Sequence, residues 1–199
     1  MSRILSLSPA HAAEIESLAR RLYPESYHLS EEEIAENLEG VEEEGCNFCL
    51  GIQDDDKRLV GYLLAWLDNT LIEGRIEDVV LVDDLAMLPS ARSQLVNLLR
   101  CLLRAMDEAG CSGAPIEGTV RKSLEQNFTA HPEVVESLGY QLVGSHEYTD
   151  ESLEEVLVWI RFEAVEGRVR QFDDEDDEEP DELEDLGDTA RLELEDDFA

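Results

Sequence analysis

The sequence predicts a mixed α/β domain with an irregular order of strands and helices. Apolar residues recur at strand spacing in some segments and at helix spacing in others, and these segments follow one another in the order βααβββαβαββ. That order is neither the regular alternation of a doubly wound sheet nor the pattern of an all-β protein. With 199 residues and 43% apolar content, the chain has the size and composition of one globular domain. We expect this domain to occupy residues 1–165.

The chain should open with a short strand and a helix. Residues 3–7 alternate between polar and apolar, as expected of a strand. Ser8 followed by Pro9 is typical of a helix start, because the hydroxyl caps free backbone N–H groups and proline fits the first helical position. Apolar residues at helical spacing continue this helix, and Pro24 should end it.

A second helix is expected directly afterwards. Ser30 and Glu33 have the spacing of a capping box, in which each side chain accepts a hydrogen bond from the other residue's backbone N–H. Ile34 and Leu38 then share one face of the helix. Gly40 is the expected end of this helix.

The next three elements are predicted strands. Residues 47–53 and 59–66 are strand-like and are joined by the turn-forming residues 54–57, so together they predict a hairpin. Residues 79–87 form a nearly continuous apolar run, which is typical of a central strand buried on both faces. Pro89 should end this strand.

The remaining elements complete the order. Leucines at helical spacing predict a strongly amphipathic helix over residues 95–106, which Gly110 should close. The other expected elements are a strand over 116–120, a short helix from Pro132 to a cap at Gly139, and two closing strands over 140–143 and 156–162.

Acidic residues outnumber basic residues by 49 to 15, which gives a formal net charge of −34. Residues 173–199 alone carry 16 acidic residues and one basic residue, or −15, which leaves −19 for the rest. We expect residues 166–199 to form a disordered acidic tail, because such a segment buries too little apolar surface to offset its ordering entropy. The charge argues against direct binding of nucleic acids or anionic membranes and favours cationic substrates or partners.

The N-terminus has no apolar signal segment, and no apolar run approaches the length of a membrane span. We therefore expect a cytoplasmic protein. Cys46 and Cys49 are too few and too isolated for a metal site, and at odd spacing along a strand they point to opposite faces. We interpret all four cysteines as small buried hydrophobic residues.

Three local sequences carry a resemblance to a known family. They are residues 59–62 (LVGY) in one predicted strand, 82–89 (VDDLAMLP) in the next, and 136–140 (ESLGY) at the last helix end. In this order and spacing they resemble the GNAT superfamily of N-acetyltransferases. The resemblance implies a central mixed, mostly antiparallel sheet flanked by helices. The resemblance covers residues 1 to about 163.

The resemblance implies a site for acetyl-CoA beside the strand over residues 79–87. In the family the pantetheine arm pairs with strand backbone. The pyrophosphate lies at the start of the next helix, where free N–H donors and the helix dipole attract phosphate. The residues implied are Leu85, Met87 and Leu88 on the strand, Arg92, Ser93, Gln94, Leu95, Val96 and Asn97 at the helix start, and Asn127 beside the pantetheine arm.

The sequence departs from the family pattern at three positions. The family has small residues where Leu95 and Asn97 stand, because these allow backbone to approach the phosphates closely. Many members also have a tyrosine that protonates the departing thiolate where Val135 stands, and valine transfers no proton. We expect the nearby Tyr140 to be a core residue.

Two acidic residues and a group of basic residues remain as candidates for chemistry. Asp83 and Asp84 lie on the predicted central strand, where alternation places their side chains on opposite faces, and one of them is the expected general base. The alternative is that one caps a turn and the other meets a basic neighbour. The basic residues near the implied cofactor channel are Arg92, Arg100, Arg104, Arg121 and Lys122. Arg100 and Arg104 also fit the solvated face of an amphipathic helix.

Three functions stay open from the sequence. The first is an acetyl-CoA-dependent N-acetyltransferase acting on an amine of a small molecule or protein. The second is a catalytically degenerate GNAT-fold module for binding or regulation, with the acidic tail contacting a basic partner. The third makes the tail itself active, as a nucleic-acid mimic that occupies a basic surface. The resemblance also makes a homodimer an expected assembly.

Overall fold

A single seven-stranded sheet forms the centre of the computed structural model, which describes residues 2–23, 29–44, 47–72, 75–122, 132–150 and 155–165. The strand order is β1-β2-β3-β4-β5-β7-β6, and all neighbours are antiparallel except β4 and β5. The strands are β1 (Arg3–Ser6), β2 (Leu50–Gln53), β3 (Leu59–Ile72), β4 (Arg75–Met87), β5 (Ile116–Arg121), β6 (Tyr140–Asp150) and β7 (Glu155–Ala164).

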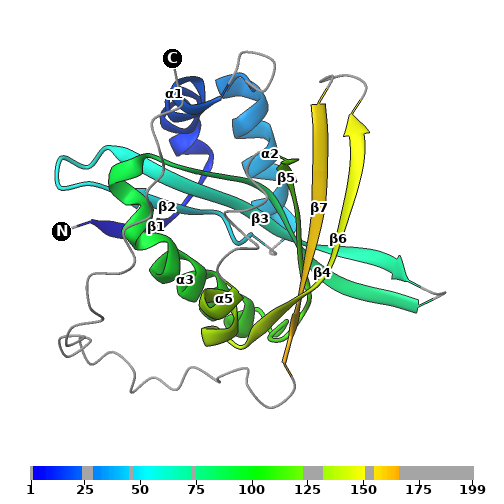
Figure 1. Cartoon of the computed structure of the whole chain (residues 1–199). Helices are drawn as coiled ribbons and strands as arrows, with labels where there is room; N and C mark the ends of the chain where they lie inside the picture. The colour runs from blue at the N-terminus through cyan, green and yellow to red at the C-terminus, as the bar shows by residue number, and fades with distance from the viewer. Residues whose placement is uncertain are drawn as a thin grey trace, which may run out of the picture.

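The helices lie on both sides of this sheet (Figure 1). A short 3₁₀ helix, η1 (Pro9–His11), leads into α1 (Ala12–Leu22), and α2 (Glu31–Glu44) follows. A second 3₁₀ helix, η3 (Pro89–Gln94), leads into α3 (Leu95–Glu108), and α5 (Pro132–Ser137) precedes β6. The predicted order βααβββαβαββ is confirmed.

The predicted start of α2 is also confirmed at the level of hydrogen bonds. The backbone N–H of Ser30 donates to the Glu33 carboxylate at 2.8 Å, and the N–H of Glu33 donates to the Ser30 hydroxyl at 3.3 Å. This reciprocal pair is the expected capping box, and its hydrogen bonds lower the pKa of Glu33. The helix closures at Gly110 and Gly139 have the positive φ angles, 76° and 83°, that glycine adopts without strain.

Several predicted boundaries are wrong, at the ends of α2, β3 and β6 and at the start of β4. Helix α2 continues past Gly40 to Glu44, because an internal glycine costs a helix only about 1 kcal/mol. Buried Ile34 and Leu38 hold the same helix against the sheet. Strands β3 and β4 extend beyond the apolar runs, to Ile72 and from Arg75, because the two strands pair with each other along their whole length. In the same way, β6 pairs with β7 well beyond the predicted end at residue 143.

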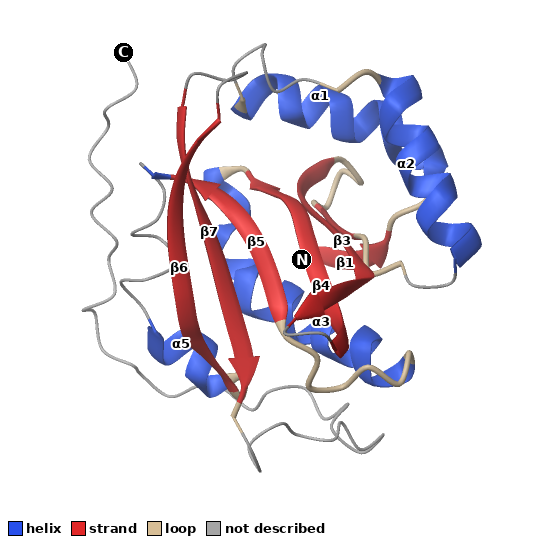
Figure 2. Cartoon of the chain, turned by 90° about the vertical axis from the view of Figure 1, so that its right-hand side faces the viewer, coloured by secondary structure: helices blue, strands red, loops and turns tan. Residues whose placement is uncertain are grey.

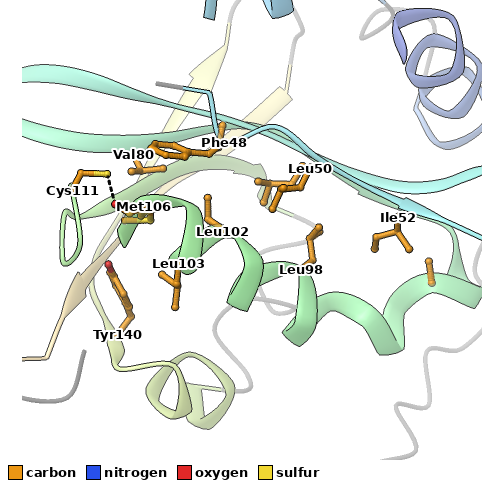
Figure 3. Close-up of a cluster of buried hydrophobic side chains, with 13 residues drawn as sticks. Phe48, Leu50, Ile52, Val80, Leu98, Leu102, Leu103, Met106, Cys111 and Tyr140 are labelled. Carbon is orange, nitrogen blue, oxygen red and sulfur yellow. Dashed lines mark hydrogen bonds between the residues drawn. The ribbon is translucent and has the colours of Figure 1, made fainter. Parts of the chain in front are cut away.

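Two apolar cores form on the two faces of the sheet. On one face, α3 contributes Leu98, Leu102 and Met106, which pack against Phe48, Leu50, Ile52 and Val80 (Figure 3). On the other face, α1 and α2 cover Tyr62, Leu64 and Ala86 with a second set of apolar side chains, which includes Ile15, Leu18, Ile34 and Leu38. Figure 2 shows β5, β7 and β6 side by side, at the end of the sheet away from β1.

The two halves of the sheet diverge between β4 and β5. These parallel strands pair only over Val80–Val82 and Ile116–Gly118. Beyond this point, among the described residues, β4 continues to Met87 paired with β3 alone, and β5 continues to Arg121 paired with β7 alone. Gly118 lies where the strands part, and a Cβ added there would lie 3.2 Å from the carbonyl oxygen of Val82. The last residue pair of β4 and β5 is therefore packed closely enough that a side chain larger than that of glycine would press on the Val82 backbone.

Candidate active site

A β-bulge in β4 lies at the point of divergence. Ala65 of β3 faces Val82, and its neighbour Leu64 faces Asp84, so Asp83 is an extra residue with no partner in this register. A bulge breaks the alternation of side chains and redirects them. Asp83 and Asp84 therefore both lie on the face covered by α1 and α2, and the prediction that they point to opposite faces is wrong.

Two tyrosine hydroxyls hold the Asp84 carboxylate. Tyr23, at the end of α1, donates to Oδ1 at 2.7 Å, and Tyr62 of β3 donates to Oδ2 at 2.5 Å. The Tyr62 side chain is completely buried, and this burial, together with the charge of Asp84, raises the pKa of Tyr62. Its hydroxyl therefore remains a hydrogen-bond donor. The sequence had also allowed that one of the two aspartates meets a basic neighbour; in the structure, Asp84 accepts hydrogen bonds from two tyrosine hydroxyls.

Asp83 lies at the edge of a shallow depression between α2 and the sheet. The residues that line it are mostly apolar, namely Leu29, Ile34, Asn37, Leu38, Cys49, Leu64 and Trp66. Asp83 keeps contact with solvent, yet its packing against these side chains and the charge of Asp84 both raise the pKa of its carboxyl. The site thus contains a carboxyl group that accepts a proton more readily than an ordinary aspartate.

The edge of β4 that faces the divergence carries backbone groups outside the β4–β5 pairing. The N–H of Leu88 donates to the Val60 carbonyl at 2.8 Å, so Leu88 faces β3. Because backbone groups alternate along a strand, Leu85 and Met87 face the opposite, open edge. The Leu88 carbonyl in turn accepts from Ala91 N–H at 2.9 Å. Of the three strand residues implied by the resemblance, Leu85 and Met87 therefore present backbone to the divergence, whereas both backbone groups of Leu88 are hydrogen-bonded within the protein.

The residues predicted to bind phosphate are divided between two helices, with Arg92, Ser93 and Gln94 in η3 and Leu95, Val96 and Asn97 in the first turn of α3. The N–H of Ala91 donates to the Leu88 carbonyl at 2.9 Å and the N–H of Leu95 donates to the Arg92 carbonyl, so the donors from Ala91 onward follow the 3₁₀ pattern, in which each N–H bonds to the carbonyl three residues earlier. These donors are therefore already used inside the helix. Arg92 and Ser93 are exposed, Gln94, Leu95 and Val96 are half-buried, and Asn97 is hydrogen-bonded to Gln94 and Arg100.

Neither a known family model nor a curated protein sequence matches the chain. Solved structures match it at low sequence identity. An acetyltransferase of the GNAT family from Streptococcus pneumoniae has a TM-score of 0.61 and 15% identity, over 83% of this chain and 99% of the other. The ribosomal-protein-S18-alanine N-acetyltransferase from Escherichia coli has a TM-score of 0.57 and 16% identity, over 86% of this chain and 100% of the other. A GNAT superfamily phosphinothricin acetyltransferase from Sinorhizobium meliloti in complex with AcCoA has a TM-score of 0.57 and 16% identity, over 85% of this chain and 92% of the other.

This chain has the GNAT fold. The predicted fold class, a mostly antiparallel sheet flanked by helices, is therefore confirmed. The expected acidic tail lies outside the described residues. Within the described ranges, no helix is long and apolar enough to cross a membrane.

The α3 region is the most basic part of this GNAT fold. Between Pro89 and Met106 the sequence has three arginines and no acidic residue, in a chain with 49 acidic residues. Arg92, Arg100 and Arg104 are all exposed. Lys122, the other basic candidate with a described side chain, forms an ion pair with Glu147 at 2.6 Å. The Arg121 side chain and Asn127 lie outside the described part of the structure.

The two residues that sequence reasoning compared with the family's general acid both lie on the α3 side of the sheet. Val135 packs against the apolar core there. Tyr140 is almost completely buried, and its hydroxyl donates to the Ala114 carbonyl at 3.2 Å. Burial raises the pKa of Tyr140 to about 12. The prediction that Tyr140 is a core residue is confirmed.

The cysteines also behave as packing residues. Cys49 and Cys111 are buried and Cys101 is half-buried, and all three are free thiols. Burial raises the pKa of Cys49 to about 11, which keeps the thiol protonated at neutral pH. Among the described residues, no group of three or more His, Cys, Asp or Glu side chains is arranged to hold a metal ion. Cys46 lies outside those residues.

A buried ion-pair network lies on the same face as Asp83. Arg161 of β7 donates to Glu117 of β5 at 2.6 Å and to Glu77 of β4 at 3.0 Å. Trp159 Nε1 also donates to Glu117, at 3.2 Å. Phe162 packs against the α3 core, so its neighbour Arg161 faces the other side of the sheet. This network joins β4, β5 and β7 next to the point where β4 and β5 part.

Proposed function

We propose that this protein is an acetyl-CoA-dependent N-acetyltransferase that transfers an acetyl group to an amine of a small molecule or protein. One observation carries the proposal. Leu85 and Met87 direct backbone groups away from β3, at the edge of β4 that lies beyond its pairing with β5. This edge lies directly beside a bulge that brings Asp83 and Asp84 to one face. A strand edge suited to main-chain pairing with a ligand therefore lies next to two carboxyl groups suited to acid–base chemistry.

Leu85 and Met87 suit a ligand that contains amide groups, because an exposed strand edge binds such groups by main-chain hydrogen bonds. The phosphates of acetyl-CoA need a different partner. Since the N–H donors of η3 are used within the helix, we assign the phosphates to the side chains of Arg92, Arg100 and Arg104. Guanidinium groups bind phosphate with paired hydrogen bonds, so they are suited to this task.

The carboxyl groups suit an amine acceptor. An amine must be deprotonated before it attacks a thioester, and a carboxylate beside it both attracts the ammonium form and accepts the proton. The raised pKa of Asp83 brings its proton affinity closer to neutral pH than that of an ordinary aspartate. Positioning of the two substrates at the divergence supplies further acceleration.

The proposal is tested by release of the thiol from acetyl-CoA in the presence of a panel of amines. The panel contains a diamine, a lysine ester and a tetrapeptide with a free N-terminus. Wild-type protein should turn over at least one of them, and Asp83→Asn with Asp84→Asn should abolish the turnover while binding of acetyl-CoA is retained. Turnover that is equal in the wild type and the double variant would disprove the assignment of the site.

A second function is favoured by the closed hydrogen bonding of η3 and by Leu95 and Asn97. In this reading the protein has kept the scaffold as a binding or regulatory module, with residues 166–199 contacting a basic partner. Leu95→Gly distinguishes the two functions. A degenerate site should gain affinity for acetyl-CoA when the loop can open, whereas a site adapted to Arg side chains should gain little. Deletion of residues 173–199 tests the role of the tail in partner binding.

A further inference from the structure

We propose that Tyr23 is a catalytic residue of this acetyl transfer, and that its hydroxyl passes a proton between the reacting amine and the Asp84 carboxylate. This inference rests on the proposed function, since it assigns the proton path of the same reaction. The Tyr23 hydroxyl would supply the proton-transferring group that is missing at position 135, where this chain has valine.

The position of Tyr23 is the first argument. Tyr23 follows the last residue of α1 and has an extended backbone, with φ −119° and ψ 152°. Its side chain reaches β4, where the hydroxyl lies 2.7 Å from Oδ1 of Asp84 and 3.2 Å from the carbonyl oxygen of Leu85. The Leu85 carbonyl belongs to the open edge of β4. The Tyr23 hydroxyl therefore lies at the edge where the proposed function places the substrates.

The difference between the two tyrosines is the second argument. Tyr62 is completely buried beneath Asp84, so its hydroxyl serves to fix the carboxylate from the interior. Tyr23 is only half-buried and approaches the same carboxylate from the opposite oxygen atom. A proton that moves between the open edge and Asp84 thus has Tyr23 as its direct path.

The proton steps balance along this path. When the amine nitrogen attacks the thioester carbonyl carbon, the new C–N bond leaves a surplus proton on nitrogen. That proton passes to the Tyr23 oxygen as the tyrosine proton passes to Oδ1 of Asp84. When the C–S bond breaks, its electron pair leaves with sulfur, and the path runs in reverse to deliver the proton to sulfur. The products are the amide and the thiol, and Tyr23 and Asp84 return to their starting states.

The test compares three variants with the best amine of the panel above and acetyl-CoA. Tyr23→Phe removes only the hydroxyl. Asp84→Asn keeps a hydrogen-bond acceptor and removes the proton acceptor. Tyr140→Phe is the matched control, because it removes another buried hydroxyl that lies on the α3 side of the sheet. Binding of acetyl-CoA is measured separately by calorimetry.

We expect Tyr23→Phe to lower kcat by about 10²–10⁴-fold, the usual contribution of a proton-transfer group, with unchanged affinity for acetyl-CoA. Asp84→Asn should lose a similar factor, and the double variant should lose little more, because the two groups act as one unit. Tyr140→Phe should stay close to the wild type. If Tyr23→Phe does not fold, Asp84→Asn and a solvent deuterium isotope effect on wild-type kcat provide the test, and absence of both effects overturns the proposal.

Retention of kcat within about fivefold in Tyr23→Phe would overturn the proton path and leave the proposed function standing. A wild-type protein that neither binds acetyl-CoA nor releases the thiol would overturn the proposed function itself, and the proton path with it. Separate measurement of binding and turnover keeps the two failures distinct.

Discussion

The Arg161 guanidinium lies 2.6 Å from Oε1 of Glu117, and the two side chains are only 11% and 10% exposed. The same guanidinium also contacts Glu77 at 3.0 Å, so one side chain links three strands beside the divergence of β4 and β5. Removal of one partner from a buried ion pair leaves the other charge without compensation, which typically costs about 3–5 kcal/mol.

Arg161→Met should therefore lower the free energy of unfolding by about 3–5 kcal/mol, measured by urea denaturation. Arg58→Met is the matched control, because Arg58 pairs with Asp54 and Asp56 while 72% of its side chain is exposed. Exposed pairs of this kind contribute about 0.2–1 kcal/mol. Equal losses in the two variants would show that the Arg161 network contributes no more than a surface pair.

A comparison of two glycines tests the packing at the divergence. Gly118→Ala places a Cβ 3.2 Å from the Val82 carbonyl oxygen, and backbone cannot move aside easily, so we expect a loss of about 1–3 kcal/mol. Gly40→Ala in α2 meets nothing within 4 Å and should gain about 0.5–1 kcal/mol, because alanine is the better helix former. Thermal melting of both variants measures the difference. A stabilised Gly118→Ala would contradict the close contact of β4 and β5.

The raised pKa of Asp83 predicts a dependence of stability on pH. Between its unfolded pKa, about 3.9, and its higher folded pKa, the native state binds more protons than the unfolded state. The contribution of Asp83 to stability therefore falls as pH rises through this window. Asp83→Asn should remove this decrease in the free energy of unfolding, and at pH values above the folded pKa of Asp83 the variant should be more stable than the wild type.

Asp54→Asn provides a control of opposite sign in the same experiment. Hydrogen bonds from the Arg58 backbone lower the pKa of Asp54, so its contribution is present above its unfolded pKa and is lost as pH falls. Urea denaturation of the wild type and both variants across acidic pH gives the curves. Parallel curves for wild type and Asp83→Asn would contradict the environment described for Asp83.

Exposed Arg92, at the end of η3, offers a test of the phosphate assignment. Arg92→Ala should weaken binding of acetyl-CoA by roughly tenfold or more, because a hydrogen bond to a charged group contributes about 1.5–3 kcal/mol. Arg20→Ala is the control and should leave the affinity unchanged, because Arg20 pairs with Glu16 on α1, which covers the face of the sheet opposite to α3. Calorimetric titration of both variants measures this, and equal affinities would mean that Arg92 does not contact the phosphates.

Local signals allowed much of the fold to be predicted from the sequence. The order of elements follows from apolar spacing, and the capping box at Ser30 and Glu33 forms as its spacing indicates. The cap at Gly139 likewise depends on residues close to it in the chain. The full length of β3 and β4 was not predictable in this way, since their outer ends are held by pairing with each other.

The arrangement of the candidate site was less predictable, because it depends on contacts between distant residues. Asp83 and Asp84 share a face only because β3 and β4 pair in a register that leaves one residue extra. Tyr23 and Asp84 are 61 residues apart, and no local pattern marks them as partners. A tyrosine after a predicted helix end is a common feature, so only the packing of α1 on the sheet reveals its role.

The most direct test of the account is the thermal stability of the purified protein with and without acetyl-CoA. Ligand at about 100 times its dissociation constant adds about 2.7 kcal/mol to the free energy of unfolding. For a domain of this size the melting temperature should then rise by about 5–11 °C. A rise of that size, reduced in Arg92→Ala, is the predicted result. No rise at millimolar acetyl-CoA would contradict the assignment of a cofactor site to the divergence of β4 and β5.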